Sequence, residues 1–259
     1  MKRLAAMLMI GMLASGVLAT PIRADDGDYH VYLPLVTQPI IERIRNADFE
    51  GGQWQEVRWW RWPCAIASDE QFDEDRPAGE WTGWWVENQA CNHNPYFATG
   101  RPEFTLITTA VDARRVVDGT QAAKAFTFWR CGLFGYFQRI TLPAGEYRFG
   151  AFIHTWYTSC SSDPYGPLPR DKNCLLFRTG EHMRVWLGVA RGDVTDFWEN
   201  IIWSDAYERY GTYGPERFWS PTIRLDEAAT ITLWIKTESD LPLRHNDLYM
   251  DSAVVERLP

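Results

Sequence analysis

The stretch that decides the fold is EYRFGAFIHTWYT, residues 146–158. Tyr147, Phe149, Ala151 and Ile153 fall on one side of an extended chain, and the intervening residues fall on the other. Apolar residues that recur with a period of two are typical of a β-strand with one face against a core. The segment therefore predicts a long β-strand.

The same alternation recurs along the chain. It is clear in MRVWLGVAR (183–191) and ATITLWIKT (229–237). It also marks EFTLITTAV (103–111), KAFTFWR (124–130), GYFQRITL (135–142) and LYMDSAVVE (248–256). Helices are predicted only as short candidates near 196–200. Many short strands separated by turn residues favour an all-β sandwich or barrel. We expect one domain over 46–259, interrupted by two long insertions at about 63–100 and 158–182.

The N-terminus has the pattern of a secretory signal peptide. Lys2 and Arg3 precede an apolar run that ends at Ala19. Such a run behind a basic tip is typical of a cleaved signal, and it is shorter than the roughly 20 residues of a spanning helix. We predict a signal over 1–24, cleaved after Ala19 or Ala24, and an extended linker over 25–45. The mature protein is then secreted or associated with the cell envelope, with no membrane span.

The charge balance limits the partners. The chain has 34 acidic and 26 basic residues, a formal net charge of −8. Nucleic acid and anionic lipid are bound by clustered Lys and Arg, so this composition argues against both. Partners that are neutral or carry cations remain open.

Five cysteines in an exported chain indicate disulfides. Cys160 and Cys174 lie at the two ends of a loop rich in Pro, Asp and Ser, and Cys64 and Cys91 bracket the first insertion. These positions predict two disulfides, Cys160–Cys174 and Cys64–Cys91. Cys131 would then be a buried thiol.

The common catalytic motifs are absent from the sequence. It has no Gly-x-Ser-x-Gly, no His-Glu-x-x-His and no Gly-rich phosphate loop. We therefore expect no enzymatic activity. Paired carboxylates could still serve a glycoside hydrolase, and Glu80, Glu87, Glu103 and Glu199 are eligible.

Tryptophan is the most unusual feature of the composition, with 14 residues. Flat indole rings stack on the apolar faces of sugars, and aromatic-lined concavities are common ligand sites. The alternative is that the indoles fill a large core, because aromatic residues favour strands. We predict a ligand-binding surface near the first insertion, formed by Trp59, Trp60, Trp62, Trp84, Trp85 and Trp156.

Three motifs in order carry a resemblance to a known family. They are NADFEGGQW (46–54), GYFQRITLPAGEYRFGAFIHTW (135–156) and HNDLYMDSAVV (245–255). The chain resembles the jelly-roll carbohydrate-binding modules found beside cellulases and xylanases, and similar exported bacterial proteins that are uncharacterised. The resemblance implies a galactose-binding-like jelly roll with a structural calcium ion. By position, Glu50 and Asp251 would be the side-chain ligands, although Ser252 stands where such modules usually have a second Asp.

Together these observations predict a secreted, non-catalytic carbohydrate-binding protein that recognises a polysaccharide or cell-envelope glycan. Two alternatives stay open. One is a jelly-roll glycoside hydrolase or polysaccharide lyase. The other is a structural or adhesion protein that binds an envelope protein partner.

Overall fold

The computed structural model describes residues 44, 47–50, 57–61, 67–70, 80–91, 94–158, 182–197, 199–208 and 217–259. All of them belong to one compact unit, Gln38–Pro259. The predicted signal peptide, the linker apart from Ile44, and the second insertion lie outside the described residues, and so do Trp62, Cys64, Cys160 and Cys174.

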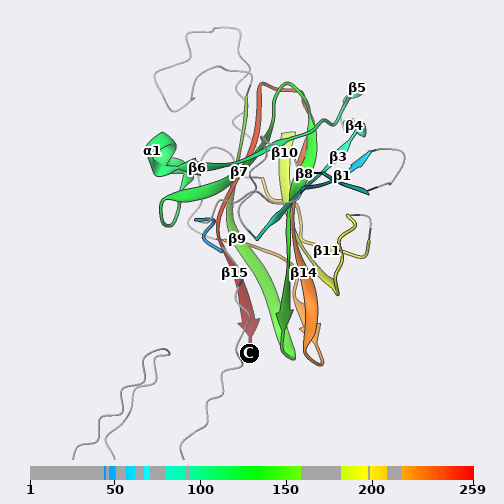
Figure 1. The fold of residues 1–259 in the computed structure, drawn as a ribbon, viewed down its shortest axis with the longest axis vertical. Coiled ribbons are helices and arrows are strands. Elements are labelled where there is room, and N and C mark those ends of the chain that lie inside the picture. The colour runs from blue at the N-terminus through cyan, green and yellow to red at the C-terminus, as the bar shows by residue number, and fades with distance from the viewer. Residues whose placement is uncertain are drawn as a thin grey trace, which may run out of the picture. The chain divides into compact units, whose positions relative to one another are not determined.

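Among the described residues, one sheet has seven strands in the order β11-β10-β14-β8-β3-β1-β2. Its central strands are β14 and β8, which pair antiparallel along their whole length (Figure 1). The bounds are β1 Val57–Arg61, β2 Ala67–Glu70, β3 Thr82–Glu87, β8 Gly132–Leu142, β10 Met183–Arg191, β11 Ile202–Trp203 and β14 Ala229–Ser239.

The second sheet has the order β12-β9-β15-β7-β6, and β13 also pairs with β9. The bounds are β6 Glu103–Thr108, β7 Gln121–Thr127, β9 Gly145–Thr158, β12 Phe218–Trp219, β13 Ile223–Leu225 and β15 His245–Leu258. A separate small hairpin joins β4 (Ala90–Cys91) to β5 (Asn94–Ala98). After β6 come a short helix α1 (Thr109–Asp112) and a 3-10 turn over Ala113–Arg115.

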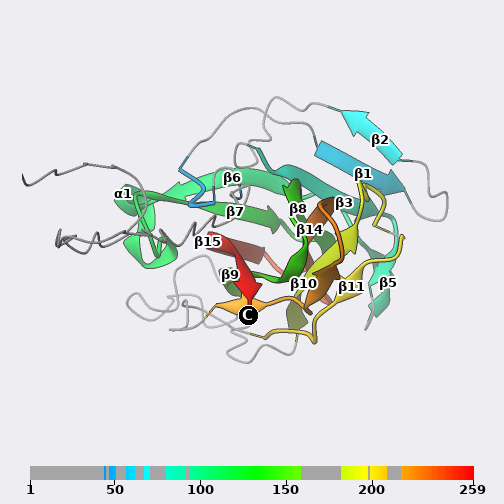
Figure 2. The ribbon, with the colours of Figure 1, turned by 90° about the horizontal axis from the view of Figure 1, so that it is seen from below.

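The two sheets form the layers of a β-sandwich, with β6, β7, β15 and β9 in one layer and β3, β8, β14 and β10 in the other (Figure 2). The predicted apolar stripe of residues 146–158 is buried between the layers, because Tyr147, Phe149 and Ala151 are fully covered. Phe104 of β6 packs edge-on against Tyr136 of β8, at 5.2 Å between ring centroids. The all-β sandwich predicted from the alternation is confirmed.

A second apolar cluster covers the outer face of the seven-stranded sheet. Trp84, Phe137 and Trp234 are buried there, and Phe197 and Trp203 pack over them. Trp84 stacks on Phe197 at 4.7 Å and donates its indole N–H to the carbonyl of Ile235 at 3.2 Å. Val194, Phe197, Ile201 and Trp203 therefore extend the core, and no helix forms near 196–200 in the part of it that is described.

Three boundaries differ from the sequence-based expectation. The first insertion contains β3, which lies between β8 and β1 inside the sheet, so residues 82–87 belong to the core fold. The strand predicted over 103–111 ends at Thr108, where α1 follows. The strand predicted over 124–130 ends at Thr127, because the chain turns at Phe128 to enter β8. No helix in the described ranges has the length and hydrophobicity to span a membrane.

Candidate functional site

Three of the six predicted surface tryptophans have described side chains, and all three are buried, so the prediction is wrong for them. Trp84 and Trp85 are fully buried, and Trp156 is 6% exposed. Trp59 and Trp60 lie in β1, paired in parallel register with Trp85 and Val86. As ligand-binding residues Trp59, Trp60 and Trp62 stay predictions. Trp85 and Trp84 fill two apolar layers, one on each face of the seven-stranded sheet.

Two exposed aromatic side chains lie instead next to each other at the turn between β7 and β8, and a third, Phe97 of β5, is exposed elsewhere. Phe128 is 45% exposed and Trp129 is 54% exposed. Among the tryptophans whose side chains are described, Trp129 alone is exposed. We call residues Phe128–Arg130 the aromatic turn. Its two rings lie 6.2 Å apart at an angle of 81°, so one ring stands edge-on beside the face of the other.

The backbone of the aromatic turn is strained and held from several sides. Trp129 has a φ of 55°, which is uncommon for a bulky residue and is found at sites where the surroundings impose it. Its N–H donates to the carbonyl oxygen of Leu243 at 2.8 Å. The Thr127 hydroxyl donates to the carbonyl of Arg130 at 2.6 Å and closes the turn. These bonds direct the indole outward.

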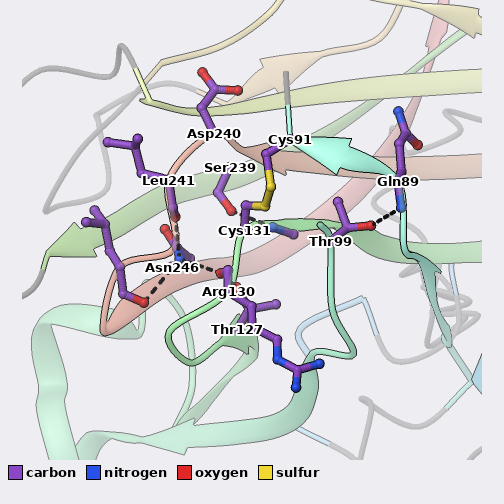
Figure 3. Close-up of a disulfide and its surroundings, with 12 residues drawn as sticks. Gln89, Cys91, Thr99, Thr127, Arg130, Cys131, Ser239, Asp240, Leu241 and Asn246 are labelled. Carbon is purple, nitrogen blue, oxygen red and sulfur yellow. Dashed lines mark hydrogen bonds between the residues drawn. A yellow bond between two sulfur atoms is a disulfide. The ribbon is translucent and has the colours of Figure 1, made fainter. Parts of the chain in front are cut away.

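A disulfide and an asparagine anchor the end of the turn (Figure 3). Cys131 is bonded to Cys91 of the β4–β5 hairpin. Asn246, which is buried, donates its side-chain N–H groups to the carbonyls of Arg130 at 2.9 Å and Leu241 at 3.1 Å (Figure 3). The amide thereby joins the aromatic turn to the loop between β14 and β15. A buried amide whose donors are all hydrogen-bonded makes the surrounding structure rigid.

The disulfide corrects the predicted pairing. Cys91 is bonded to Cys131, so the Cys64–Cys91 prediction is wrong, and Cys131 is not a free thiol. Cys64 and Cys91 flank the same insertion in sequence, but β3 carries the chain away into the sheet before Cys91. The Cys160–Cys174 disulfide stays a prediction.

Basic side chains surround the aromatic turn. The guanidinium of Arg244 lies 5.7 Å from the centre of the Phe128 ring, and the His245 ring meets Phe128 edge-on at 5.6 Å. Arg130, in the turn itself, is exposed. Burial lowers the pKa of His245; the Asp247 carboxylate raises it, the charges of Lys124 and Arg244 lower it, and the net shift is downward. The two arginines are the permanent charges in contact with, or part of, the aromatic turn.

Trp156 is unavailable to a sugar for a specific reason. Arg115, itself 3% exposed, places its guanidinium 4.1 Å from the Trp156 ring and 4.6 Å from the Tyr249 ring. The indole face is therefore already occupied by a cation. The Tyr249 hydroxyl donates to Asp247 at 2.8 Å, and Lys124 pairs with the same carboxylate at 3.0 Å. These residues form a buried polar network on the outer face of the second sheet.

His154 lies in the same network. Its ring stacks on Tyr249 at 4.6 Å, and its Nδ1 lies 3.2 Å from a guanidinium nitrogen of Arg115. Burial holds the pKa of His154 well below its ordinary value, and the neighbouring Arg115 charge acts in the same direction. Because Arg115 can only donate, Nδ1 accepts and the neutral ring carries its proton on Nε2.

The two predicted calcium ligands both bind the loop that precedes β7. Asp251 accepts the N–H groups of Val117 at 2.7 Å and Asp118 at 3.0 Å through one oxygen, and that of Ser252 at 2.7 Å through the other. Burial raises the pKa of Asp251 to about 6 against these donors. Glu50 accepts the N–H groups of Thr120 and Gln121 and the Thr120 hydroxyl.

This arrangement does not by itself fit a calcium ion. Calcium takes six to eight oxygen ligands, and the carboxylate oxygens of Glu50 and Asp251 already accept hydrogen bonds. Within the described ranges, no three His, Cys, Asp or Glu side chains gather as a metal site would require. Structural calcium stays a prediction from the sequence.

A second aromatic surface lies on the seven-stranded sheet. The ammonium of Lys236 is 3.8 Å from the centre of the Trp186 ring and 4.9 Å from that of Trp203. Burial lowers the pKa of Lys236, while the nearby Glu238 charge raises it. The protein's own cation lies over Trp186, which leaves less of this indole for a ligand than of Trp129.

The sequence contained a signal for the aromatic turn that the alternation obscured. In KAFTFWR, Phe126 and Phe128 keep the period of two, but Trp129 follows Phe128 directly and breaks it. This break in the alternation coincides with the end of β7 at Thr127. The strained φ of Trp129 and the contact with Leu243 could not be predicted, because both depend on a loop far along the chain.

No family model matches this chain, and no curated protein matches it. Among solved structures, it is similar to TmCBM61 in complex with β-1,4-galactotriose. The identity is 15%, the match covers 70% of this chain and 91% of the other, and the TM-score is 0.41. It is similar to the C-terminal family 22 carbohydrate-binding module of Clostridium thermocellum Xyn10B, at 12% identity over 69% of this chain and 86% of the other, with a TM-score of 0.36.

A third similar structure is the Stig cyclase Fisc from Fischerella sp. TAU. The identity is 13%, the match covers 85% of this chain and 98% of the other, and the TM-score is 0.41. Two of the three are carbohydrate-binding modules and one is an enzyme. At these identities and TM-scores, we draw no conclusion about ligand or activity from the likeness.

Proposed function

We propose that this chain is a secreted, non-catalytic carbohydrate-binding protein and that the aromatic turn holds the sugar. The observation that carries the proposal is the exposure of Phe128 and Trp129 on a strained backbone. Exposed large aromatic rings cost free energy in water. Strained backbone conformations cluster at functional sites, so an exposed indole on a strained backbone points to a role in binding.

The geometry of the turn suits a sugar. The face of one ring offers a stacking surface for the C–H groups of a pyranose, and the second ring, at 81° to the first, forms a wall beside it. Donors for sugar hydroxyls are close, because Arg130 belongs to the turn and Arg244 lies over Phe128. An aromatic surface with a few placed polar groups is the usual composition of a ligand site.

The anchoring of the turn favours binding as well. The disulfide and the bonds from Asn246 fix the backbone before a ligand arrives. A preorganised surface loses less conformational entropy on association. The disulfide also supports an oxidising compartment, since such bonds persist mainly outside the cytosol.

One observation favours a polysaccharide lyase as a second candidate. Tyr249 has Arg115 on its face and donates to Asp247, which pairs with Lys124. A tyrosine beside cations could transfer a proton in β-elimination. However, Tyr249 is 5% exposed, so a substrate would have little access. Unsaturated product released from a uronate polysaccharide by the wild type, and none by Tyr249→Phe, would establish the lyase and remove the non-catalytic proposal.

The binding proposal is tested by affinity gel electrophoresis on a panel of soluble polysaccharides. The folded protein should be retarded by at least one polymer, and Trp129→Ala should move freely on that gel with an unchanged melting curve. Ile202→Ala, which removes a comparably exposed side chain at 52%, serves as the control and should be retarded like the wild type. No retardation of the wild type on any polymer would overturn the proposal.

A further inference from the structure

Two arginines at the aromatic turn have no partner for their charge among the residues that the structure describes. Among the arginines whose side chains are described, Arg130 and Arg244 are those whose guanidinium groups make no hydrogen bond or ion pair. Elsewhere the pattern is different. Arg139, for example, binds Asp193 at 2.9 Å.

Acidic residues outnumber basic residues in this chain by 34 to 26, so most arginines are expected to have a carboxylate partner. Two buried carboxylates lie in the neighbouring loop and strand, and each has a basic partner other than Arg130 and Arg244; the second oxygen of Asp247 lies 3.8 Å from Nδ1 of His245. Asp240 binds Arg184 at 3.1 Å, and Asp247 binds Lys124 at 3.0 Å. Within the described part of the chain, the exposed rings of the aromatic turn are thus accompanied by two arginines without an ion-pair partner, on a protein that is negative overall.

Arg244 is also prepared to bind an anion. Its Nε is buried and has no hydrogen-bond acceptor, while its guanidinium lies over the Phe128 ring. The group has therefore lost part of its hydration before any ligand arrives. A planar guanidinium presents paired N–H donors whose spacing matches the two oxygens of a carboxylate.

From these observations we propose that the ligand is an acidic glycan, a polysaccharide that carries uronic acid carboxylates. This inference rests on the proposed function of the aromatic turn and specifies its substrate class. The pyranose ring stacks on the turn while its carboxylate binds Arg244, and Arg130 adds a second cation for the same or the next residue of the polymer.

The net charge of the chain does not prevent such binding. Screening at physiological ionic strength limits the reach of exposed charges to about 8 Å. The acidic residues elsewhere on the surface therefore repel a polyanion weakly. The two arginines act at contact distance and therefore determine the preference for acidic over neutral glycans.

The test uses polygalacturonate, alginate and glucuronoxylan, each beside its carboxyl-reduced counterpart, which keeps the backbone and loses the charge. We expect retardation on at least one native polymer, with an affinity at least tenfold higher than on its reduced form. Arg244→Gln should lower the affinity for the native polymer to that for the reduced one, and Arg244→Lys should restore it in part. Arg139→Gln makes the same change of charge at a distant exposed ion pair and should behave as the wild type.

The outcomes separate this inference from the function beneath it. Equal affinity for native and reduced polymers, or binding only to neutral glycans through Trp129, overturns the acidic specificity and leaves the binding function standing. Retention on the native polymer that Arg139→Gln weakens as much as Arg244→Gln overturns the site and reduces the effect to net charge. No retention on any charged or neutral polymer overturns both proposals.

Discussion

The backbone N–H of Trp129 donates to the carbonyl oxygen of Leu243 at 2.8 Å, which joins the turn after β7 to the loop before β15. This bond holds Trp129 in the left-handed region, at a φ of 55°. The most exposed described indole of the chain thus depends on a contact between segments far apart in the sequence.

Replacement of Trp129 by glycine should separate binding from stability. Glycine adopts a positive φ without the steric cost of about 1 kcal/mol that other residues carry. Because the indole is 54% exposed, little packing is lost. We expect Trp129→Gly to melt at or above the wild-type temperature while it loses glycan retention. A decrease of several degrees in its melting temperature would show that the indole packs against the fold.

Loss of the disulfide should destabilise the protein strongly. Cys91 and Cys131 are separated by 40 residues, and closing a loop of this size contributes about 4 kcal/mol in the chain-entropy model. We expect Cys131→Ser to lower the free energy of urea unfolding by a comparable amount. Peptide mapping without reduction should recover a Cys91–Cys131 cross-link. A Cys64–Cys91 peptide would instead restore the pairing predicted from sequence and contradict the structure.

The carboxylate of Asp251 should be a main support of the loop before β7. It is fully buried and accepts three backbone N–H groups. Asparagine cannot accept all three, and an unsatisfied buried group costs about 1–3 kcal/mol. We expect Asp251→Asn to lower the unfolding free energy by that amount, measured by urea titration. Asp193→Asn, at an exposed ion pair, should change it by less than about 0.5 kcal/mol.

The same variant tests the calcium prediction. An ion on Asp251 would make a chelator lower the melting temperature of the wild type and leave that of Asp251→Asn unchanged. A wild-type melting temperature that is equal with and without chelator would remove calcium from the account.

His154 should make stability depend on pH. Its folded-state pKa is held well below the ordinary value of about 6.5. As the pH falls through that value, the unfolded chain binds a proton that the folded chain does not. The unfolding free energy therefore decreases toward acid, by up to about 1.4 kcal/mol per pH unit. Because glutamine can still accept from Arg115, His154→Gln should show a shallower decrease between pH 7.5 and 5 in urea titrations. Parallel curves for the two proteins would contradict the shift.

The sequence predicted those parts of the fold that depend on local periodicity. Tyr147, Phe149 and Ile153 alternate in sequence and are buried as expected. The prediction that Trp84 and Trp85 are exposed is wrong, because two adjacent aromatic residues do not indicate which face of a strand is buried. In the structure both faces of β3 are covered, one by the sandwich core and the other by the segment 194–203. That segment has no regular pattern that would predict its position.

The candidate site was hidden for a similar reason. Trp129 is exposed because β7 ends at Thr127 and the chain turns there. The hydrogen bond to Leu243 holds the strained backbone of Trp129. The bond between Cys91 and Cys131 links a hairpin to a turn, and only the paired sheets bring these together. The local sequence shows where strands form, whereas contacts between distant loops depend on how the strands are ordered in the sheets.

The most direct test of the central claim is a ¹H–¹⁵N NMR spectrum of the indole N–H groups, recorded with and without a glycan that retards the protein. The signal of Trp129 is assigned by its absence in Trp129→Phe. We predict that this signal shifts or broadens on addition of the glycan, while those of the buried Trp84, Trp85 and Trp234 stay in place. A Trp129 signal that does not move while that of Trp186 shifts would contradict the account and place the ligand on the seven-stranded sheet.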